Sequence, residues 1–259
     1  MNTLVDAPVV RTGPSYWVNS YLAMVRFELI NLRTFLALAF VIQIMTGAGM
    51  AFLYGFYLGD VPEVARLFIV TGIPALALVP IGLVMVPNSI MIHKISDTYD
   101  FVWSLPVPRT TSAAATFTVF TGLAVPGTLI ALLVADGYYG VDLAWSPLLV
   151  PAVLLTSLMA TSVGFAIAHA IPEPRFTNLL TNIIMFLAIL FAPIVVPIAQ
   201  FPEWWASVHR VLPFYHMAQV LRDSLSNGLV ESAGISWMIL GAWTIGAWFL
   251  AAWVVGRRK

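Results

Sequence analysis

The sequence predicts an all-α membrane protein. We expect an N-terminal interfacial helix, six transmembrane helices, and short re-entrant or surface helices between the fifth and sixth spans. Two observations predict this class. Apolar residues make up 60% of the 259 residues and charged residues only 9%, whereas an ordinary soluble domain is about a quarter charged. Six stretches also lack Asp, Glu, Lys and Arg and are long enough to cross a bilayer, which needs about 20 apolar residues.

These six charge-free stretches are the predicted spans, in order along the chain. They cover residues 34–59, 67–92, 110–135, 143–168, 176–199 and 232–256. No remaining segment is long enough to fold by itself, so we expect residues 1–259 to form one transmembrane domain. The chain contains no cysteine, which excludes a disulfide, a thiolate metal site and a cysteine nucleophile.

Residues 15–33 precede the first span and are amphipathic. Apolar residues recur there at helical spacing, while Asn19, Arg26 and Arg33 stand seven residues apart on another side. This pattern predicts a helix that lies in the cytoplasmic interface with its apolar face toward the lipid. The alternative is that residues 15–33 are the start of a long first span.

Prolines are concentrated in the second and fifth predicted spans. The second contains Pro74, Pro80 and Pro87, and the fifth contains Pro193 and Pro197 near its outer end. Each proline removes a backbone donor, so we expect kinks whose freed carbonyls find partners on neighbouring helices. The clustering weakly indicates that these two spans move or line a pathway.

The distribution of Lys and Arg predicts the orientation. With six spans both termini share one side of the membrane, and cytoplasmic termini place nine basic residues inside and three outside. The inside set is Arg11, Arg26, Arg33, Lys94, Arg109, Arg175, Arg257, Arg258 and Lys259, and the outside set is Arg66, Arg210 and Arg222.

The longest predicted outer segment, residues 201–228, contains two short helical patterns separated by Pro213. Two short helices packed at the outer surface or dipping back into the bilayer fit this pattern better than a solvated loop. His209 and His216 stand seven residues apart on either side of the proline. We expect them to be solvated surface residues rather than a metal pair.

The sequence shows no energy source for transport within the chain. A phosphate-binding P-loop needs Gly-Lys followed by Ser or Thr, but the only lysines are Lys94, which follows His93, and the terminal Lys259. The predicted spans lack ionisable Asp, Glu, Lys and Arg, which argues strongly against proton coupling and less strongly against sodium coupling. A zinc-protease motif is absent, and His169 is the one candidate histidine for serine hydrolysis at membrane depth. A separate subunit on the cytoplasmic side is the simplest energy source.

The cytoplasmic loop 93–109 resembles the corresponding loop of ABC-2 type transporter permeases. That loop typically carries a Gly-Thr-Leu-Glu tetrad followed by Ser-x-Pro-Val-x-Arg. Here Asp97-Thr98-Tyr99-Asp100 stands at the tetrad and Ser104-Leu105-Pro106-Val107-Pro108-Arg109 at the second motif. The second motif matches well. In the tetrad an aspartate replaces the glycine, and the final carboxylate is shorter than the usual glutamate.

The resemblance implies that this loop is a coupling helix seated in a groove of an ATPase. It places charged residues of the loop at the docking surface and aromatic residues in the groove as anchors. The residues so implicated are Asp97, Asp100, Phe101, Trp103, Pro106 and Arg109. For Trp103 the alternative is that it rests in the membrane interface as a belt residue.

A second resemblance lies in the outer segment, where ABC-2 permeases carry two re-entrant helices, an Asn-Pro turn and an arginine about nine residues further on. Pro213 and Arg222 fit this pattern, with Leu212 in place of the asparagine. The family implies two permease chains, identical or homologous, working with two ABC ATPase subunits that bind ATP and Mg. The family tendency is toward export. A short polytopic subunit without a fused ATPase is typical of a prokaryotic cytoplasmic membrane, and we expect this chain to bind no cofactor.

Polar residues within the spans are candidates for a transport pathway. They are Gln43, Thr46, Thr177, Asn178, Thr181 and Asn182. Such groups either hydrogen-bond across helices or face a path, and we favour the structural role.

Three functions are compatible with the sequence. The first is the membrane subunit of an exporter, driven by a separate ATPase, whose cargo is an amphiphile such as a drug, an antibiotic, a lipid or a lipid-linked glycan. The second is a stand-alone sodium-coupled or facilitative carrier. The third is a membrane assembly or sensor protein that transports nothing. Membrane lipid is an expected partner in every case, and nucleic acid in none.

Overall fold

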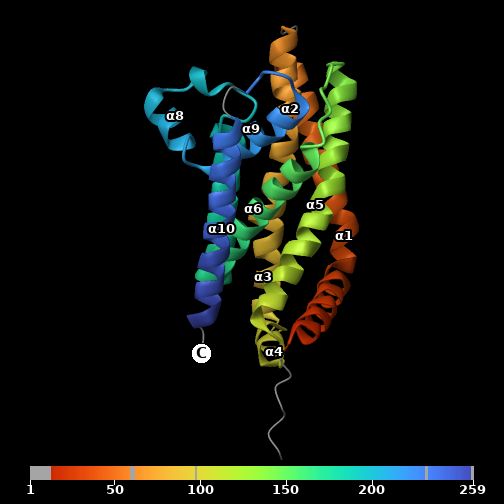
Figure 1. The fold of residues 1–259 in the computed structure, drawn as a ribbon, viewed down its shortest axis with the longest axis vertical. Helices are drawn as coiled ribbons and strands as arrows, with labels where there is room; N and C mark the ends of the chain where they lie inside the picture. Colours follow the sequence, from red (N-terminus) through yellow and green to blue (C-terminus); the bar gives the residue numbers. More distant parts are fainter. Residues whose placement is uncertain (1–12, 59–61, 97, 231–232, 258–259) are drawn as a thin grey trace, which may run out of the picture.

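The structure, a computed structural model, describes residues 13–58, 62–96, 98–230 and 233–257. Its helices pack side by side into an elongated bundle (Figure 1). Six helical stretches of the described chain are long and apolar enough to cross a membrane, which confirms the predicted all-α membrane class. They are α1 (Pro14–Leu58), the stretch Glu63–Ile95, α5 (Arg109–Tyr139), α6 (Leu149–Ala170), α7 (Pro174–Phe191) and α10 (Ala233–Arg257).

Helix α1 joins the predicted interfacial segment and the first predicted span. The segment 15–33 is helical, as expected, but it is not confirmed as a separate element because the helix runs on for 45 residues. A helix of that length is about 68 Å long, roughly twice the thickness of the hydrocarbon core. The sequence explains the continuity, since neither proline nor glycine occurs between Pro14 and Gly47.

The second span contains a π-helical segment at its middle. Helix α2 (Glu63–Pro80) passes into η1 (Ile81–Met85), which has π-helical hydrogen bonds, and then into α3 (Val86–Ile95). The irregularity follows Pro80 directly, as expected where a proline removes a backbone donor. Most of this stretch is buried by neighbouring helices, so the wide turn lies at the centre of the bundle.

Glycines let η1 and α6 approach closely. A Cβ added to Gly164 of α6 would overlap the carbonyl oxygen of Gly82 in η1, and a Cβ on Gly82 would overlap the backbone of Ala160. Small residues at such a crossing allow two membrane helices to make backbone contact. The packing of the second span on the fourth therefore depends on these two glycines.

Helix α7 is shorter than the fifth predicted span. It ends at Phe191, well before the predicted end at residue 199. Turns follow, and then a short 3-10 helix, η2 (Ile198–Gln200). Pro193 and Pro197 fall in this irregular stretch, where they stop the helix rather than kink it.

The two ends of the bundle carry different short helices. Helices α8 (Glu203–His209) and α9 (Pro213–Leu225) lie at one end, with α8 projecting to the side. The short helix α4 (Thr98–Ser104) lies at the opposite end, as does the C-terminal end of α10 (Figure 1). Pro213 occupies the first turn of α9, where its fixed φ favours helix initiation.

Substituting alanine for Gly164 should destabilise the protein by about 1–3 kcal/mol, because the added methyl group overlaps the Gly82 carbonyl. The matched control is Gly122→Ala in α5, where a Cβ meets no atom within 4 Å. That change should be neutral or stabilising by up to about 1 kcal/mol, through helix propensity alone. Thermal unfolding of the purified variants in detergent measures both effects. Equal stabilisation by the two alanines would contradict this account of the crossing.

Candidate functional site

Helix α4 occupies the loop in which the sequence predicts a coupling element. Asp100 lies in its first turn and is exposed, and the Phe101 side chain is 58% exposed. Pro106 and Arg109, which follow α4, are exposed as well. Asp97 lies outside the described residues, and the Trp103 side chain is outside what the structure describes. An apolar ring beside a carboxylate on an exposed helix is a chemically reasonable docking surface for another protein.

The chain around α4 is hydrogen-bonded to the beginning of α1. The Tyr16 hydroxyl donates to the carbonyl oxygen of Pro106. The Trp17 indole N–H donates to the Thr110 hydroxyl over 3.0 Å. These bonds join α1 to the α4–α5 connection at Pro106 and to the first turn of α5 at Thr110, so a displacement of that region would act on α1 directly.

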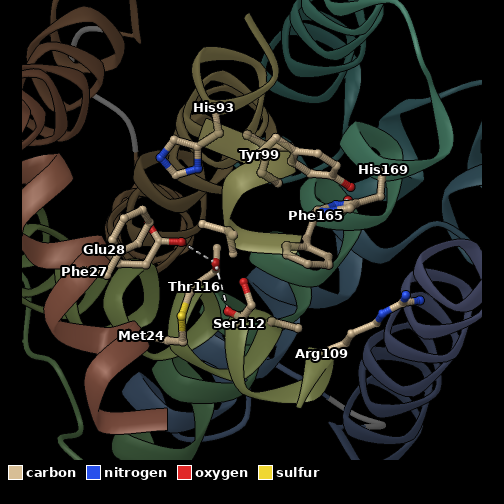
Figure 2. Close-up of a pocket in the computed structure, with 13 residues that line it drawn as sticks. Met24, Phe27, Glu28, His93, Tyr99, Arg109, Ser112, Thr116, Phe165 and His169 are labelled. Carbon is tan, nitrogen blue, oxygen red and sulfur yellow. Dashed lines mark hydrogen bonds between the residues drawn. The ribbon is translucent and has the colours of Figure 1, made fainter. Parts of the chain in front are cut away.

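A group of polar and aromatic side chains lies behind α4 (Figure 2). They line a cavity of about 40 Å³, and include Glu28, His93, Tyr99, Thr116, Phe165 and His169. The Tyr99 ring of α4 lies 5.8 Å from the His169 ring, and the His169 ring stacks on Phe165 at 4.0 Å. Helix α4 therefore contacts a ring stack on α6.

Glu28 is the principal residue that the sequence analysis missed. Its carboxylate is 5% exposed, and its Oε1 accepts a 2.8 Å hydrogen bond from the Thr116 hydroxyl of α5. Its Oε2 is buried without a hydrogen-bond partner. The available signal was that Glu28 is the one acidic residue between Asp6 and Asp60. In the structure the long α1 packs it against α5.

Lys94 ties the end of α3 to the end of α6. Its ammonium group donates to the carbonyl oxygens of Ala168 at 2.5 Å and Ile171 at 2.9 Å. A cation is favourable at a helix C-terminus, where carbonyls lack intrahelical partners. The segments on both sides of α4 are thus bonded to other helices: α3 to α6, and the α4–α5 connection to α1.

Arg222 in α9 holds several elements together at the opposite end of the bundle. The side chain is fully buried, and its Nη2 donates to the carbonyl oxygens of Ile194 at 2.7 Å and Phe68 at 3.0 Å. The Nε donates to the Thr71 hydroxyl, and the guanidinium lies 3.5 Å from the centre of the Phe68 ring. Burial lowers the pKa of Arg222 to about 9, so the group is charged at neutral pH. It joins α9 to α2 and to the turn after α7.

The expectation that His209 and His216 are solvated is wrong. Each is only 3% exposed. The His216 ring bonds to the Arg210 carbonyl oxygen at 2.8 Å and to the Ser236 hydroxyl at 3.0 Å. The reason is that α8 and α9 pack against the spans instead of standing in water, so side chains between them become buried.

The structure separates the polar residues proposed for a pathway. Gln43 is buried and donates across helices to the Ala124 carbonyl oxygen at 2.8 Å. The buried hydroxyls of Thr177 and Thr181 donate to carbonyls of their own helical segment. Of these three residues, Gln43 alone bonds to another helix. Asn178 is bonded to Asn182 within α7.

Thr46 and Asn182 line one large cavity. Its volume is about 680 Å³, and it lies among α1, η1, α3, α5 and α7. The other polar residues that line it are Asn31, Asn88, Ser89, His93, Ser96 and Thr98, and the remainder of the wall is mainly apolar. Exposed residues of α1, among them Phe35 and Leu38, form part of the wall. The size and the mixed lining suit a small amphiphile.

The family model described as ABC-2 type transporter matches residues 19–225. The chain belongs to this family. A search of the curated proteins found no match. The matched region begins in α1, includes α4 and the 680 Å³ cavity, and ends at the last residue of α9, three residues after Arg222.

Membership makes the chain an ABC-2 permease, the membrane-spanning subunit of an ABC transporter. It is a multi-pass membrane protein of a family that works with an ABC ATPase and often dimerises. The family is a permease family rather than a nucleotide-binding one. In this permease, α4 presents an exposed carboxylate, Asp100, beside the exposed ring of Phe101.

Replacing Arg222 with lysine should destabilise the permease by at least about 2 kcal/mol, because one ammonium group cannot reach the acceptors that the guanidinium joins. The control is Arg210→Lys, at an exposed ion pair with Glu203, where a change within about 0.5 kcal/mol is expected. Thermal unfolding in detergent, followed by size exclusion, distinguishes the two. A stable Arg222→Lys variant would show that the buried contacts do not anchor α9.

Proposed function

We propose that this permease exports an amphiphilic substrate across a prokaryotic cytoplasmic membrane, driven by a separate ABC ATPase. The substrate class comprises drugs, antibiotics, lipids and lipid-linked glycans. The observation that carries the proposal is the exposed helix α4, which contacts side chains from several spans and lies between segments bonded to α1 and α6. If another subunit displaces a helix placed in this way, the displacement is transmitted to the helices of the bundle.

The energy source in this proposal is ATP bound with Mg by the partner subunit. This chain has only two lysines, Lys94 and Lys259, and neither lies in a phosphate-binding motif. Lys94 is bonded to the end of α6, so its role is structural. Two ATPase subunits would serve two permease chains, identical or homologous.

The proposed orientation places α4 and both termini in the cytoplasm. Lys94 and Arg109 flank α4, and Arg175 follows the end of α6 that Lys94 contacts. Helix α10 ends at the same end of the bundle (Figure 1). A concentration of basic residues at one end supports a cytoplasmic location for that end.

The proposed coupling step begins when the ATPase pair closes on ATP and displaces α4. Asp100, Phe101 and Arg109 supply the described docking surface, and Asp97 and Trp103 remain predicted members of it. The displacement acts on α1 through the Tyr16 and Trp17 bonds and on α6 through the Tyr99 and His169 rings. Because α1 lines the 680 Å³ cavity, movement of α1 would change the access of cargo to it.

The proposed cargo follows from the lining of that cavity. Asn88 and Asn182 offer hydrogen bonds, and the surrounding leucine, isoleucine and phenylalanine side chains offer apolar contact. A molecule with one polar and one apolar part satisfies both. The exposed apolar faces of α1 and α7 that flank the cavity provide a surface on which a second permease chain would close it.

The double variant Asp100→Arg, Phe101→Ala should lose the bound ATPase, because it reverses a charge and removes the exposed ring of α4. Glu203→Arg, Trp204→Ala is the matched control, since it makes the same kinds of change on the exposed helix α8 at the opposite end. The tagged permease is expressed in its native host and purified in mild detergent, and ATP hydrolysis in the eluate is measured. We expect activity with the parent and the control only.

Retention of the ATPase by the α4 double variant would contradict the assignment of α4. Absence of ATPase from a well-folded parent would contradict the proposed function itself. In that case uptake by vesicles that contain this chain alone, with and without sodium, tests the carrier alternative.

A further inference from the structure

The 680 Å³ cavity has a polar end and an apolar end. On α1 its wall runs from Asn31 to Thr46, a distance of about 22 Å at 1.5 Å per residue. The Asn31 amide lies 3.5 Å from a ring nitrogen of His93 in α3, so the Asn31 end of the wall lies beside α4. The α1 residues between Asn31 and Thr46 that line the cavity are apolar. The Thr46 hydroxyl donates to the Ile42 carbonyl oxygen of its own helix. The polar groups of the cavity are therefore concentrated near α4.

Asn88 and Ser89 are the polar residues of α3 that line the cavity at the greatest depth in the membrane. Asn88 stands about two turns, or 10 Å, inside the end of α3 at Ile95. Neither side chain forms a hydrogen bond with any described residue. Unlike the ring nitrogens of His209, their polar atoms are not sealed inside the protein. Hydrocarbon offers these atoms no partner, so a molecule in the cavity is the partner available to them.

Asn182 of α7 adds a further amide to the lining at a matching depth. It stands about two turns after the start of α7 at Pro174. Its Nδ2 donates to the Asn178 carbonyl oxygen at 2.8 Å, which leaves its side-chain oxygen as an acceptor. Two amides and a hydroxyl, from helices that are distant in sequence, thus line one level of the cavity.

The lining offers hydrogen bonds but no compensating charge. None of the described residues that line the cavity is Asp, Glu, Lys or Arg. Lys94, which follows His93 in the sequence, is bonded to the end of α6. An ion in the cavity would lose its hydration without gaining a countercharge, which is costly at membrane depth. A neutral hydroxyl group loses little there, because amides and hydroxyls both donate and accept hydrogen bonds.

We infer that the cavity selects cargo whose polar head is uncharged and carries hydroxyl groups, as a sugar does. Asn88, Ser89 and Asn182 bind the head, and the apolar body lies along α1. This inference rests on the proposed function, in which the cavity holds the cargo, and it narrows the substrate class. Amphiphiles with a neutral sugar head fit the lining, whereas alkylammonium compounds and anionic lipids do not. Asn88 and Ser89 are then specificity-determining residues.

The test uses the full permease in nanodiscs and three alkyl compounds that share a decyl chain and differ in the head. They are decyl glucoside, decyl sulfate and decyltrimethylammonium. A decyl glucoside with a diazirine in its chain is the photolabel, and mass spectrometry locates the labelled residues. We expect label on apolar lining residues such as Leu38, Ile42 and Met185. Unlabelled decyl glucoside should compete at a concentration at least about tenfold lower than either charged compound, because only the ions lack a compensating partner.

Variants of Asn88 test the assignment of the head. Asn88→Leu removes the amide at similar size and should weaken labelling about fivefold, as expected for the loss of one hydrogen bond. Asn19→Leu is the matched control, because Asn19 is exposed on α1 and does not line the cavity. If Asn88→Leu does not fold, Ser89→Ala takes its place with the same expected loss. Asn88→Asp keeps the shape and adds a carboxylate, so it should strengthen competition by decyltrimethylammonium about fivefold or more.

Equal competition by the three compounds would overturn the inference. So would equal labelling of the Asn88→Leu and Asn19→Leu proteins, or a folded parent whose cavity lining takes no label. The binding measurement needs no ATP, so it is independent of the test of the proposed function. A permease that retains its ATPase but does not distinguish the three heads would refute the selectivity alone. Selective binding by a permease that retains no ATPase would refute ATP-driven export and leave the binding site.

Discussion

Hydrocarbon provides no partner for a hydrogen-bonding group, so a membrane domain has to satisfy its buried donors and acceptors internally. In the permease a few such bonds join helices that are distant in sequence, although Oε1 of Gln43 and Oε2 of Glu28 stay buried without a partner. Arg222 joins α9 to α2 and to the turn after α7. Lys94 joins α3 to α6, and Gln43 joins α1 to α5. Removal of the Arg222 side chain would leave the buried carbonyl oxygen of Ile194 without this donor and with no solvent to replace it.

The same constraint gives the two ends of the bundle different properties. At the α8 and α9 end a buried guanidinium and buried histidines pack the short helices onto the spans. At the α4 end the bonds lie around an exposed helix, and behind it lies a cavity with the partly unsatisfied carboxylate of Glu28. One end of the bundle is thus firmly anchored, and the other carries an exposed helix. This difference suits a permease whose motion begins at one side of the membrane.

Much of the architecture could be predicted from the sequence, because charge-free stretches separated by polar segments have one stable arrangement in a bilayer. The location of α4 and the short helices around Pro213 followed from local patterns of a few residues. The sequence did not predict that one helix continues through residue 33. Helix continuity depends more on the absence of proline and glycine than on the polarity of the residues. Prolines indicate where a helix can become irregular. The sequence alone does not predict which proline is followed by a π-helical turn and which one ends a helix.

The candidate site was less predictable, for a physical reason. Burial of a polar side chain depends on which helices cover it, and a single sequence does not contain those contacts. His209 was therefore predicted to be a surface residue, Glu28 carried no prediction, and Gln43 and Thr46 looked equivalent although one bonds across helices and the other lines a cavity. Arg222 was identified through family resemblance, while its acceptors on α2 lie about 150 residues away in the chain.

The central claim is that α4 passes motion of the ATPase to the cavity lined by α1. Its most direct test is the ATP dependence of maleimide labelling at Leu38→Cys, in a chain that has no other cysteine. The account predicts that ATP changes the labelling rate when the bond partner Tyr16 is intact. In Tyr16→Phe the ATPase should remain bound, but the response should be reduced. An ATP response of equal size in both proteins would contradict this account, as would labelling in the parent that ATP does not alter.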